Sequence, residues 1–329
     1  MRIIPEYEPV GKLYLSFYQD FFHTRFKYGN TICRIAEAVA DRISVEVFVT
    51  NDETEFFLGL LEQNDIKPDS ILLNHDSPER GIIQEYFPIF GEGENGEGLG
   101  LHFHHRKLEL CDSLYSFSER LLDSIGIPAL VMNESFGTAK VSVNEDLCLI
   151  ADYMASGDSG LRRLEFLRKN FPVQDFVPVP TLKGDITKDL DMYLWPIKPG
   201  IWLASQYPEN TPQEQSILPA IRRIEEHGHE VIRIPGLDRI AYDDVNTMPN
   251  YANGVLINGC ALYPSYCRPE DEIVGEILKA NGLEAIPIDC RDIILTQSGL
   301  HCISKTVPKR ILADNHCMNQ TQGLSEELR

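Results

Sequence analysis

A cysteine beside a histidine, near the C-terminal end of the sequence, is the first pair that could carry out chemistry. The two residues lie in segment 298–304 (SGLHCIS), after a strand-like run at 293–295, and Gly299 allows the backbone to turn sharply. A neighbouring histidine can hold a thiol partly as thiolate, which is the nucleophilic form of cysteine. Cys302 is therefore the predicted nucleophile. A purely structural His-Cys pair is the alternative.

Two acidic residues separated by one position form the second candidate. If Asp189 and Asp191 lie on a strand, their side chains point the same way. Two carboxylates on one face repel each other unless a cation lies between them, so the pair indicates a site for a cationic substrate or a metal. A solvated turn is the alternative. Glu85, a lone acid in the apolar and aromatic run 82–90, is the third candidate, and a strand-edge glutamate pointing to water is its alternative.

A group of histidines suggests a metal hypothesis. His102 and His104 would share one face of a strand, as zinc ligands can. However, no carboxylate or cysteine stands at a supporting spacing, and the eight cysteines include no Cys-x-x-Cys pair. We therefore predict that the site uses neither a metal nor a cofactor.

The elements that must position these residues follow a repeated order. The first part of the chain alternates strands and helices, from a strand at 13–17 to a strand at 129–132. Units of strand, strand, helix and strand are then predicted over 139–179, 192–234 and 254–288. A period of about 60 residues indicates a repeat architecture of about five such units. A doubly wound sheet is the alternative.

Together, these segments resemble the motifs of agmatine deiminases and bacterial-type peptidylarginine deiminases, of the guanidine-modifying (pentein) superfamily. Segment 299–304 is similar to the end motif of that family, and Asp189-Leu190-Asp191 falls where the family has His-x-Asp. Segment 84–90 (QEYFPIF) resembles its Arg-Asp-Tyr-Gly-Pro-hydrophobic-Phe motif. Further similar segments are 4–9, which looks like the family's start, and 250–259 with 263–266, which resemble its Ser-Tyr-hydrophobic-Asn segment and Val-Pro-x-Tyr loop.

The resemblance implies a five-bladed α/β propeller of ββαβ units with the active site at its centre. It also implies a hydrolase in which acids clamp a planar guanidinium, a cysteine thiolate attacks its carbon and a histidine shuttles protons. On this chain Cys302 would be the nucleophile, Asp191 and Glu85 would bind the cation, and Asp189 would stand in the proton-shuttle position. The covalent thio-amidino intermediate is hydrolysed, or passed to an acceptor amine in the amidinotransferase branch.

Two of these positions depart from the family pattern. Glu85 stands where the family has aspartate and is one methylene longer, and Asp189 replaces the histidine. The reference pKa of aspartate is about 3.9, so Asp189 can donate a proton at neutral pH only if its pKa is strongly raised. An active deiminase-like enzyme is the leading hypothesis, and a non-catalytic guanidine-binding protein is the alternative. Glu134, Asn253 and His301 are further predicted to line the substrate pocket.

Composition limits the class of protein and its partners. The 329 residues are 43% hydrophobic and carry a formal net charge of −20, which argues against nucleic acid as a partner. No apolar run approaches the roughly 18 residues of a membrane span, and no signal-peptide pattern opens the sequence. We expect a cytoplasmic protein with one catalytic domain over 1–311 and a polar tail over 312–329. A cationic small molecule is the expected partner, with a homodimer as one possible assembly.

Overall fold

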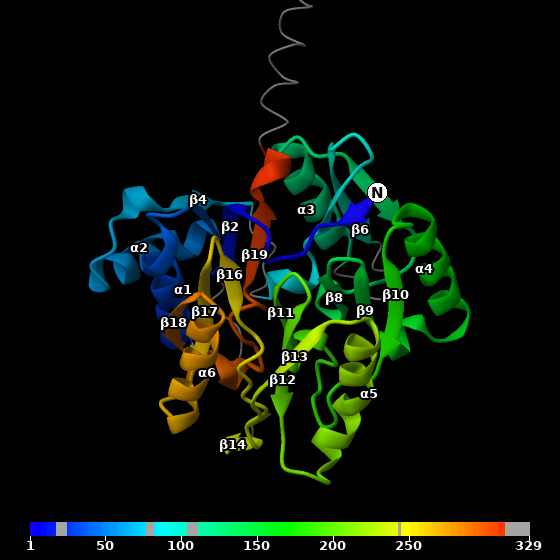
Figure 1. The fold of residues 1–329 in the computed structure, drawn as a ribbon. Helices are drawn as coiled ribbons and strands as arrows, with labels where there is room; N and C mark the ends of the chain where they lie inside the picture. The colour runs from blue at the N-terminus through cyan, green and yellow to red at the C-terminus, as the bar shows by residue number, and fades with distance from the viewer. Residues whose placement is uncertain (18–24, 77–81, 104–110, 243–244, 313–329) are drawn as a thin grey trace, which may run out of the picture.

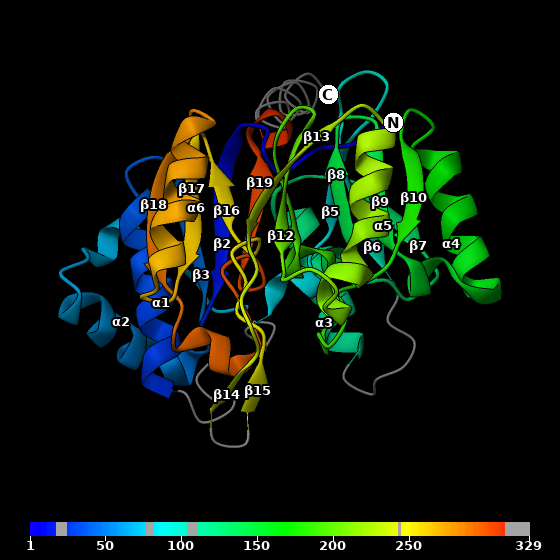
Figure 2. The same cartoon turned by 60° about the horizontal axis from the view of Figure 1, so that its bottom comes forward.

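Five small sheets and one separate hairpin surround a central axis (Figures 1 and 2). They are described in a computed structural model that covers residues 1–17, 25–76, 82–103, 111–242 and 245–312. Each sheet, with its helices, forms one blade. The inner strand of a blade pairs antiparallel with its middle strand, and the middle strand pairs parallel with the next strand outward.

Three blades consist of inner strand, middle strand, helix and outer strand in chain order. The third blade contains β8 (Val141–Asn144), β9 (Leu147–Ala151), α4 (Gly157–Asn170) and β10 (Asp175–Val179). The fourth contains β11 (Leu194–Lys198), β12 (Ile201–Gln206), α5 (Pro212–Glu226) and β13 (Glu230–Pro235). The fifth contains β16 (Val255–Ile257), β17 (Cys260–Ser265), α6 (Pro269–Ala280) and β18 (Glu284–Asp289).

The first two blades use the chain termini. The second blade contains β5 (Ile89–Glu92), β6 (Gly98–Phe103), α3 (Cys111–Ser124) and β7 (Ala129–Met132), with β1 (Arg2–Ile3) beside β5. The first contains β19 (Ser304–Pro308), β2 (Val10–Ser16), α1 (Arg25–Val39), β3 (Ser44–Phe48), α2 (Thr54–Gln63) and β4 (Leu72–Asn74). Because β19 pairs with β2, the C-terminal strand closes the ring (Figure 1). The separate hairpin is β14 (Ile240–Tyr242) with β15 (Val245–Thr247).

Tight turns join inner to middle strands and also connect the blades. Asn258 and Gly259 link β16 to β17 with φ values of 49° and 85°, a left-handed turn that asparagine and glycine favour. The Asn258 side chain bonds the backbone N–H and C=O of Val10 at 2.8 and 3.0 Å, which ties the fifth blade to the first. Asn144, at the end of β8, accepts from the N–H of Gly200 at 3.0 Å and donates to the carbonyl of Lys198 at 2.9 Å.

The middle strands are the most deeply buried part of the fold. All five residues of β9 (LCLIA) are buried, as expected for a strand that pairs on both sides and reads as an apolar run. Most buried side chains of the first and fifth blades belong to one apolar core, and those of the third blade belong to a second core that includes Trp202 of β12. A third core joins Tyr14 and Phe48 of the first blade to the second blade. These cores hold the inner strands in place around the axis.

The predicted five-bladed propeller of ββαβ units is confirmed, but one local prediction was wrong: the run 293–295 is a 3₁₀ turn, Ile293–Thr296. The acidic pair lies at a 3₁₀ turn, Leu190–Met192, as in the turn alternative, but both side chains are buried rather than solvated. Each of these turns connects the outer strand of one blade to the inner strand of the next. His104 and the tail from 313 onward lie outside the described residues.

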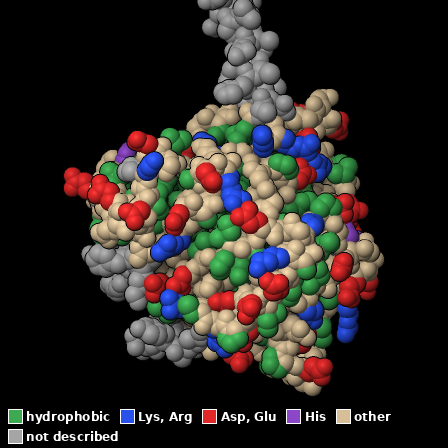
Figure 3. All heavy atoms as spheres, turned by 60° about the vertical axis from the view of Figure 1, so that its left-hand side comes forward, with side chains coloured by type: hydrophobic (Ala, Val, Ile, Leu, Met, Phe, Trp, Pro, Cys, Tyr) green, Lys and Arg blue, Asp and Glu red, His purple; other side chains and the backbone are tan. Residues whose placement is uncertain are grey.

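The surface carries both signs of charge. On the side that bears α1, α2 and α6, acidic and basic side chains are interspersed rather than gathered in a basic stripe (Figure 3). Among the described residues, none of the helices has the length and apolar character that crossing a membrane requires.

Replacing Asn144 with alanine tests the connection between blades. The side chain is fully buried and its amide also bonds Tyr7 and the carbonyl of Ile201, so its loss leaves several buried backbone groups unpaired. We expect Asn144→Ala to lower the free energy of unfolding by about 2–4 kcal/mol in urea titrations. The exposed Asn95→Ala is the control, with an expected change within about 0.5 kcal/mol. Equal stabilities of the two variants would contradict this role.

Candidate active site

The N-terminal ends of the five inner strands bring one set of polar side chains to the axis. Each of these residues precedes the first residue of its inner strand by one to four positions. The residues are Glu85 before β5, Lys140 before β8, Asp191 before β11, Asn253 before β16 and Cys302 before β19. A repeated fold therefore places chemically different groups from all five blades at one point.

The Cys302 sulfur lies among polar groups. Its Sγ is 4.0 Å from Asp191 Oδ2 and 3.4 Å from Asn253 Nδ2, and the residue is only 3% exposed. Asn253 Oδ1 accepts from the backbone N–H of His301 at 2.9 Å and of Cys302 at 3.4 Å. A Cβ on Gly299 would lie 2.3 Å from that oxygen, so only glycine fits there. Asn253 thus holds the loop that presents Cys302.

The surroundings of Cys302 favour the neutral thiol. Burial raises the pKa of the thiol well above its ordinary value, and the nearby carboxylates of Asp191 and Asp189 raise it further. A positive charge placed beside Sγ would act in the opposite direction. An additional cation near Sγ would therefore favour the thiolate form of Cys302.

Lys140 joins the two acids that depart from the family pattern. Its Nζ lies 3.1 and 3.0 Å from the two carboxylate oxygens of Glu85 and also bonds Asp189 Oδ1. Burial lowers the pKa of Lys140, but Asp189 and Glu85 outweigh it and hold that pKa well above its usual range. Lys140 is 8% exposed, so this is a buried, fully charged ammonium group.

The same contacts set the protonation of the two acids. Burial raises the pKa of Asp189 and so does repulsion from Asp191, while Lys140 opposes both; the net pKa is well above the ordinary value. The pKa of Glu85 is also raised by burial, against the pull of Lys140. A Cβ on Gly137 would lie 2.2 Å from Glu85 Oε1, so the longer acid has room only because residue 137 is glycine.

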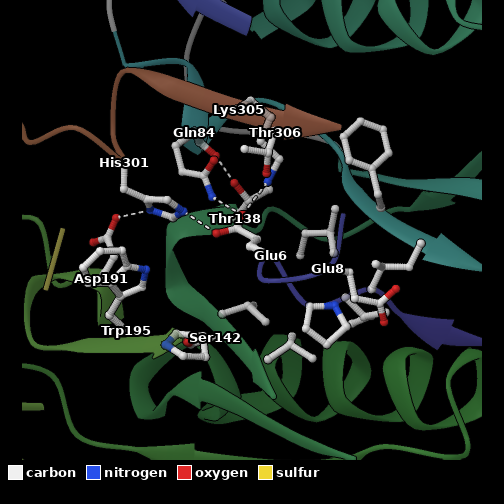
Figure 4. Close-up of a pocket in the computed structure, with 18 of the residues that line it drawn as sticks. Glu6, Glu8, Gln84, Thr138, Ser142, Asp191, Trp195, His301, Lys305 and Thr306 are labelled. Atoms are coloured by element: carbon white, nitrogen blue, oxygen red, sulfur yellow. Dashed lines mark hydrogen bonds and ion pairs between the residues drawn. The ribbon is translucent and has the colours of Figure 1, made fainter. Parts of the chain in front are cut away.

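His301 bridges two further acids (Figure 4). Its Nδ1 is 2.7 Å from Asp191 Oδ2 and its Nε2 is 2.6 Å from Glu6 Oε2. Burial lowers the pKa of His301, but Glu6 and Asp191 outweigh it and raise this pKa to about 10, so both ring nitrogens donate at neutral pH. Burial raises the pKa of Glu6, but His301 and Lys305 outweigh it and hold this pKa well below its usual range.

The charges of this central cluster nearly balance. The other oxygen of Glu6 accepts from Lys305 Nζ and from Gln84 Nε2, both at 3.2 Å. The full set of charged side chains is Glu6, Glu85, Asp189 and Asp191, with Lys140, His301 and Lys305. When all are ionised, one negative charge is in excess. The cluster can therefore accept one proton or one further cation.

Asp191 carries the free acceptor of this cluster. Its Oδ2 bonds His301, while its buried Oδ1 has no hydrogen-bond partner among the residues that the structure describes. The residue is 7% exposed, and an unpaired buried carboxylate oxygen is costly unless a donor reaches it. The same carboxylate lies beside Cys302 Sγ. A donor placed on Oδ1 would therefore bind the carboxylate whose other oxygen, Oδ2, is 4.0 Å from Sγ.

The structure brings together most of the residues predicted from the sequence. Besides Cys302 and Asp191, these are Asp189, Glu85, Asn253 and His301. Glu134 lies outside the cluster, where it forms an ion pair with Arg162 of α4. Within the described part of the chain, no group of three or more His, Cys, Asp or Glu side chains is arranged to hold a metal ion.

Sequence reasoning missed Lys140, Glu6 and Lys305. Lys140 lies within the strand predicted at the start of unit 139–179, and a lone base between the apolar residues Ala139 and Val141 was the available signal. Glu134, six positions earlier, is predicted instead because it precedes segment 136–139 (FGTA), near where the family carries a glycine-rich segment. Glu6 and Lys305 have no local signal, since they meet only where the two ends of the chain lie side by side.

Comparison with known structures defines the class of fold. An agmatine deiminase from C. jejuni superimposes with a TM-score of 0.81 at 17% identity, covering 94% of this chain and 96% of that chain. A putative arginine deiminase from Porphyromonas gingivalis gives 0.76 at 17% identity, covering 94% and 98%. A DDAH from Pseudomonas aeruginosa gives 0.53 at 11% identity, covering 91% and 100%. The fold is that of the guanidine-modifying propellers, the penteins.

A sequence model of one protein family matches part of the chain. Residues 190–308 match the model of the Porphyromonas-type peptidyl-arginine deiminase family. The predicted resemblance to the peptidyl-arginine deiminase family is confirmed over residues 190–308, and the match to an agmatine deiminase at 17% identity shows that the chain shares its fold. No curated protein sequence matches it. The matched segment contains Asp191, Asn253 and Cys302, but not Glu85 or Lys140.

Replacing Lys140 with methionine tests its role as the internal counterion. The change keeps the apolar stem but leaves Glu85 and Asp189 buried without a cation, so we expect a loss of about 3–5 kcal/mol in the free energy of unfolding at pH 7. The cost belongs to the ionised carboxylates, whose pKa values burial raises, and protonation removes it, so the loss should shrink as pH falls below 7. Lys279→Met, on an exposed pair with Glu276, is the control and should change stability by less than about 0.5 kcal/mol. A Lys140→Met protein as stable as the wild type at pH 7 would contradict the assignment.

Proposed function

We propose that the protein is a cysteine-dependent hydrolase that acts on a C–N bond of a guanidine-bearing small molecule, with Cys302 as its nucleophile. One observation carries this proposal. The carboxylate of Asp191 lies beside the Cys302 sulfur, and its buried Oδ1 lacks a partner within the described residues. A guanidinium is planar, cationic and rich in N–H donors, which suits this oxygen.

Charge balance supports a cationic substrate. One added positive charge would neutralise the excess negative charge of the central cluster. A guanidinium on Asp191 would also lower the pKa of the Cys302 thiol, which burial and the neighbouring acids raise. The substrate would thus generate the thiolate that attacks it. Because Cys302 is 3% exposed, the substrate reaches the sulfur only when the side chains around it move apart.

The reaction would proceed in two steps. The Cys302 thiolate forms a bond to the guanidinium carbon, and one C–N bond breaks as the departing nitrogen takes up the proton that the thiol released. Water then attacks the resulting S-alkyl thiouronium carbon, the C–S bond breaks and the thiol regains its proton. The sum is guanidinium plus water giving a ureido group plus an ammonium ion, or an alkylammonium ion if the substituted nitrogen leaves.

Asp189 is the proposed proton carrier in both steps. Burial and Asp191 raise its pKa well above the ordinary value, so it can hold a proton before the substrate binds. In the first step Asp189 gives its proton to the leaving nitrogen and takes up the one that the Cys302 thiol releases, so that one proton in all passes from thiol to leaving group. In the second step it takes a proton from the attacking water and returns one to the departing thiolate. Lys140 keeps Asp189 in place by bonding Oδ1. In this proposal Glu85 acts through Lys140 rather than on the substrate.

The comparisons support the proposal in part. The matched family segment includes the nucleophile, its acid and its amide, and an agmatine deiminase of the same fold has been solved with substrate bound. One observation favours a second candidate, binding without turnover. Lys140 already pairs with Glu85, one of the two acids that the resemblance assigned to the substrate cation, and with Asp189, which it assigned to proton transfer. In that case the cluster would hold a guanidinium but would not cleave it.

Product analysis separates the two candidates. The protein is incubated with agmatine, arginine or methylguanidine, and ammonium release and the intact mass are followed. We expect ammonium release with at least one of these compounds and a transient adduct on Cys302, and we expect Cys302→Ala to abolish both. Saturable binding in calorimetry without adduct or product, unchanged in Cys302→Ala, would establish the non-catalytic alternative.

Alkylation of Cys302 tests whether the site selects a cation. Chloroacetamidine is cationic and chloroacetamide is its neutral counterpart, so the ratio of their labelling rates reports electrostatic recognition. We expect at least about a tenfold preference for the amidine at pH 8, equivalent to 1.4 kcal/mol. The preference should fall as pH falls through the raised pKa of Asp189, because protonation removes the negative charge.

Two variants with the same change of charge complete the alkylation test. Asp191→Asn should remove most of the preference for the amidine, whereas Glu134→Gln, on an ion pair outside the cluster, should leave it unchanged. A preference that survives Asp191→Asn, or none in the wild type, would exclude Asp191 as the cation-binding group. Peptide mapping confirms that Cys302 is the labelled residue.

A further inference from the structure

His301 contacts the acid that is proposed to bind the substrate cation, yet it is itself a cation. Its Nδ1 donates to Asp191 Oδ2 at 2.7 Å and its Nε2 donates to Glu6 Oε2 at 2.6 Å (Figure 4). Because both ring nitrogens carry protons at neutral pH, neither can accept one from a thiol or from water. His301 is therefore unsuited to the proton transfer that a histidine beside a cysteine could otherwise perform.

A fixed positive charge at this place opposes the binding of a cationic substrate. The His301 imidazolium offsets the charge of the Asp191 carboxylate and would repel a guanidinium that arrives on Oδ1. Lys305, which is 4% exposed on β19, adds a second positive charge nearby. The site can favour a cation only if a further acid neutralises these two groups.

Glu6 contacts both positive groups with one carboxylate. Its Oε2 accepts from His301, and its Oε1 accepts from Lys305 Nζ at 3.2 Å. Burial lowers the pKa of His301, but Glu6 raises it most among the neighbouring groups and Asp191 raises it further, to about 10. Glu6 therefore keeps His301 charged and at the same time cancels the effect of that charge on a substrate.

A count of charges shows what Glu6 contributes to the cluster. The charges of Glu6, Asp191, His301 and Lys305 cancel one another. The charges of Lys140 and its two acid partners leave one negative charge in excess. Without Glu6 the whole cluster would be neutral, whereas with Glu6 one negative charge remains for a substrate cation.

The fold brings Glu6 to the axis from the start of the chain. Ile4 donates its N–H to the carbonyl of Phe90 at 3.0 Å, and the N–H of Glu8 closes a turn onto the carbonyl of Pro5 at 3.1 Å. About 40% of the Glu6 side chain is exposed, because it faces a cavity of about 60 Å³ that has room for a few water molecules. Glu8 lines the same cavity, which makes it a natural control.

We propose that Glu6 is a positioning residue that determines specificity: it neutralises His301 and Lys305, so that the charge of Asp191 remains available to a guanidinium. Glu6 acts through His301 and does not touch the substrate. This inference rests on the proposed function and adds to it a reason why the site selects a cation. The N-terminal segment thereby completes a site whose other groups precede the inner strands.

Imidazole NMR tests the contact between Glu6 and His301, with His301→Gln to assign the signal. Glu6→Gln should lower the pKa of His301 by about 1–3, because one of its two anionic partners is lost. Glu8→Gln removes a charge from the same cavity and should leave that pKa unchanged. The arginines that pair with Glu8 also bond Glu92, so they keep a partner. An unchanged His301 pKa in Glu6→Gln would contradict the assignment.

The alkylation of Cys302 tests the effect on cation selection. Below the lowered pKa of His301, Glu6→Gln should reduce the preference for chloroacetamidine over chloroacetamide from at least about tenfold to about twofold or less. As pH rises through that pKa the positive charge is lost, so the preference should return. Asp189 titrates in both proteins, so the wild type at the same pH is the reference. Glu8→Gln should keep the wild-type preference.

Lys305→Met should have the opposite effect, and it decides the question if urea unfolding curves show that Glu6→Gln does not fold. It removes one positive charge, leaves the bond between Glu6 and His301, and should raise the preference for the amidine at least about threefold. An unchanged preference in Lys305→Met would contradict the charge balance. No preference in the wild type would overturn this inference together with the proposed function. A wild-type preference that Glu6→Gln retains below the His301 pKa would overturn this inference alone.

Discussion

The ammonium group of Lys140, held between Glu85 and Asp189, is the contact on which the rest of the central cluster depends. Buried carboxylates repel each other strongly unless a cation separates them, and this fold brings four of them to its axis. With Lys140, His301 and Lys305 the cluster comes within one charge of neutrality. That remaining charge is what makes a cationic ligand beside Cys302 physically reasonable.

The propeller explains how residues far apart in sequence reach this cluster. Each blade repeats the same inner strand, and each inner strand begins at the same end of the axis, so the residue before it arrives at the centre whatever its chemistry. The blades are tied together by amide side chains, such as those of the buried Asn144 and the more exposed Asn258, which fix the strand ends relative to one another. A side chain of one blade is therefore paired with a side chain of another. Asp189, which stands where the resemblance has a histidine, bonds Lys140 of the third blade.

Much of the fold was predictable from local pattern, whereas the electrostatic partners were not. The strand–strand–helix–strand units follow from apolar periodicity and turn residues, and Cys302 and Asp191 follow from motifs that keep their order along the chain. Lys140 could not be identified in the same way, because its role exists only after three segments converge. The burial of the turn around Asp189 was not predictable for a related reason: its apolar neighbours Leu190 and Met192 join a core that forms only when the blades pack together.

In the proposed function, a cation binds to Asp191 Oδ1, beside the Cys302 sulfur. A crystal structure of the Cys302→Ser variant soaked with guanidinium chloride tests this most directly. We predict a planar guanidinium with an N–H within about 3 Å of Oδ1 and its carbon facing the introduced hydroxyl oxygen, with Lys140 still between Glu85 and Asp189. A guanidinium that displaces Lys140, or density that places it away from Asp191, would contradict the account.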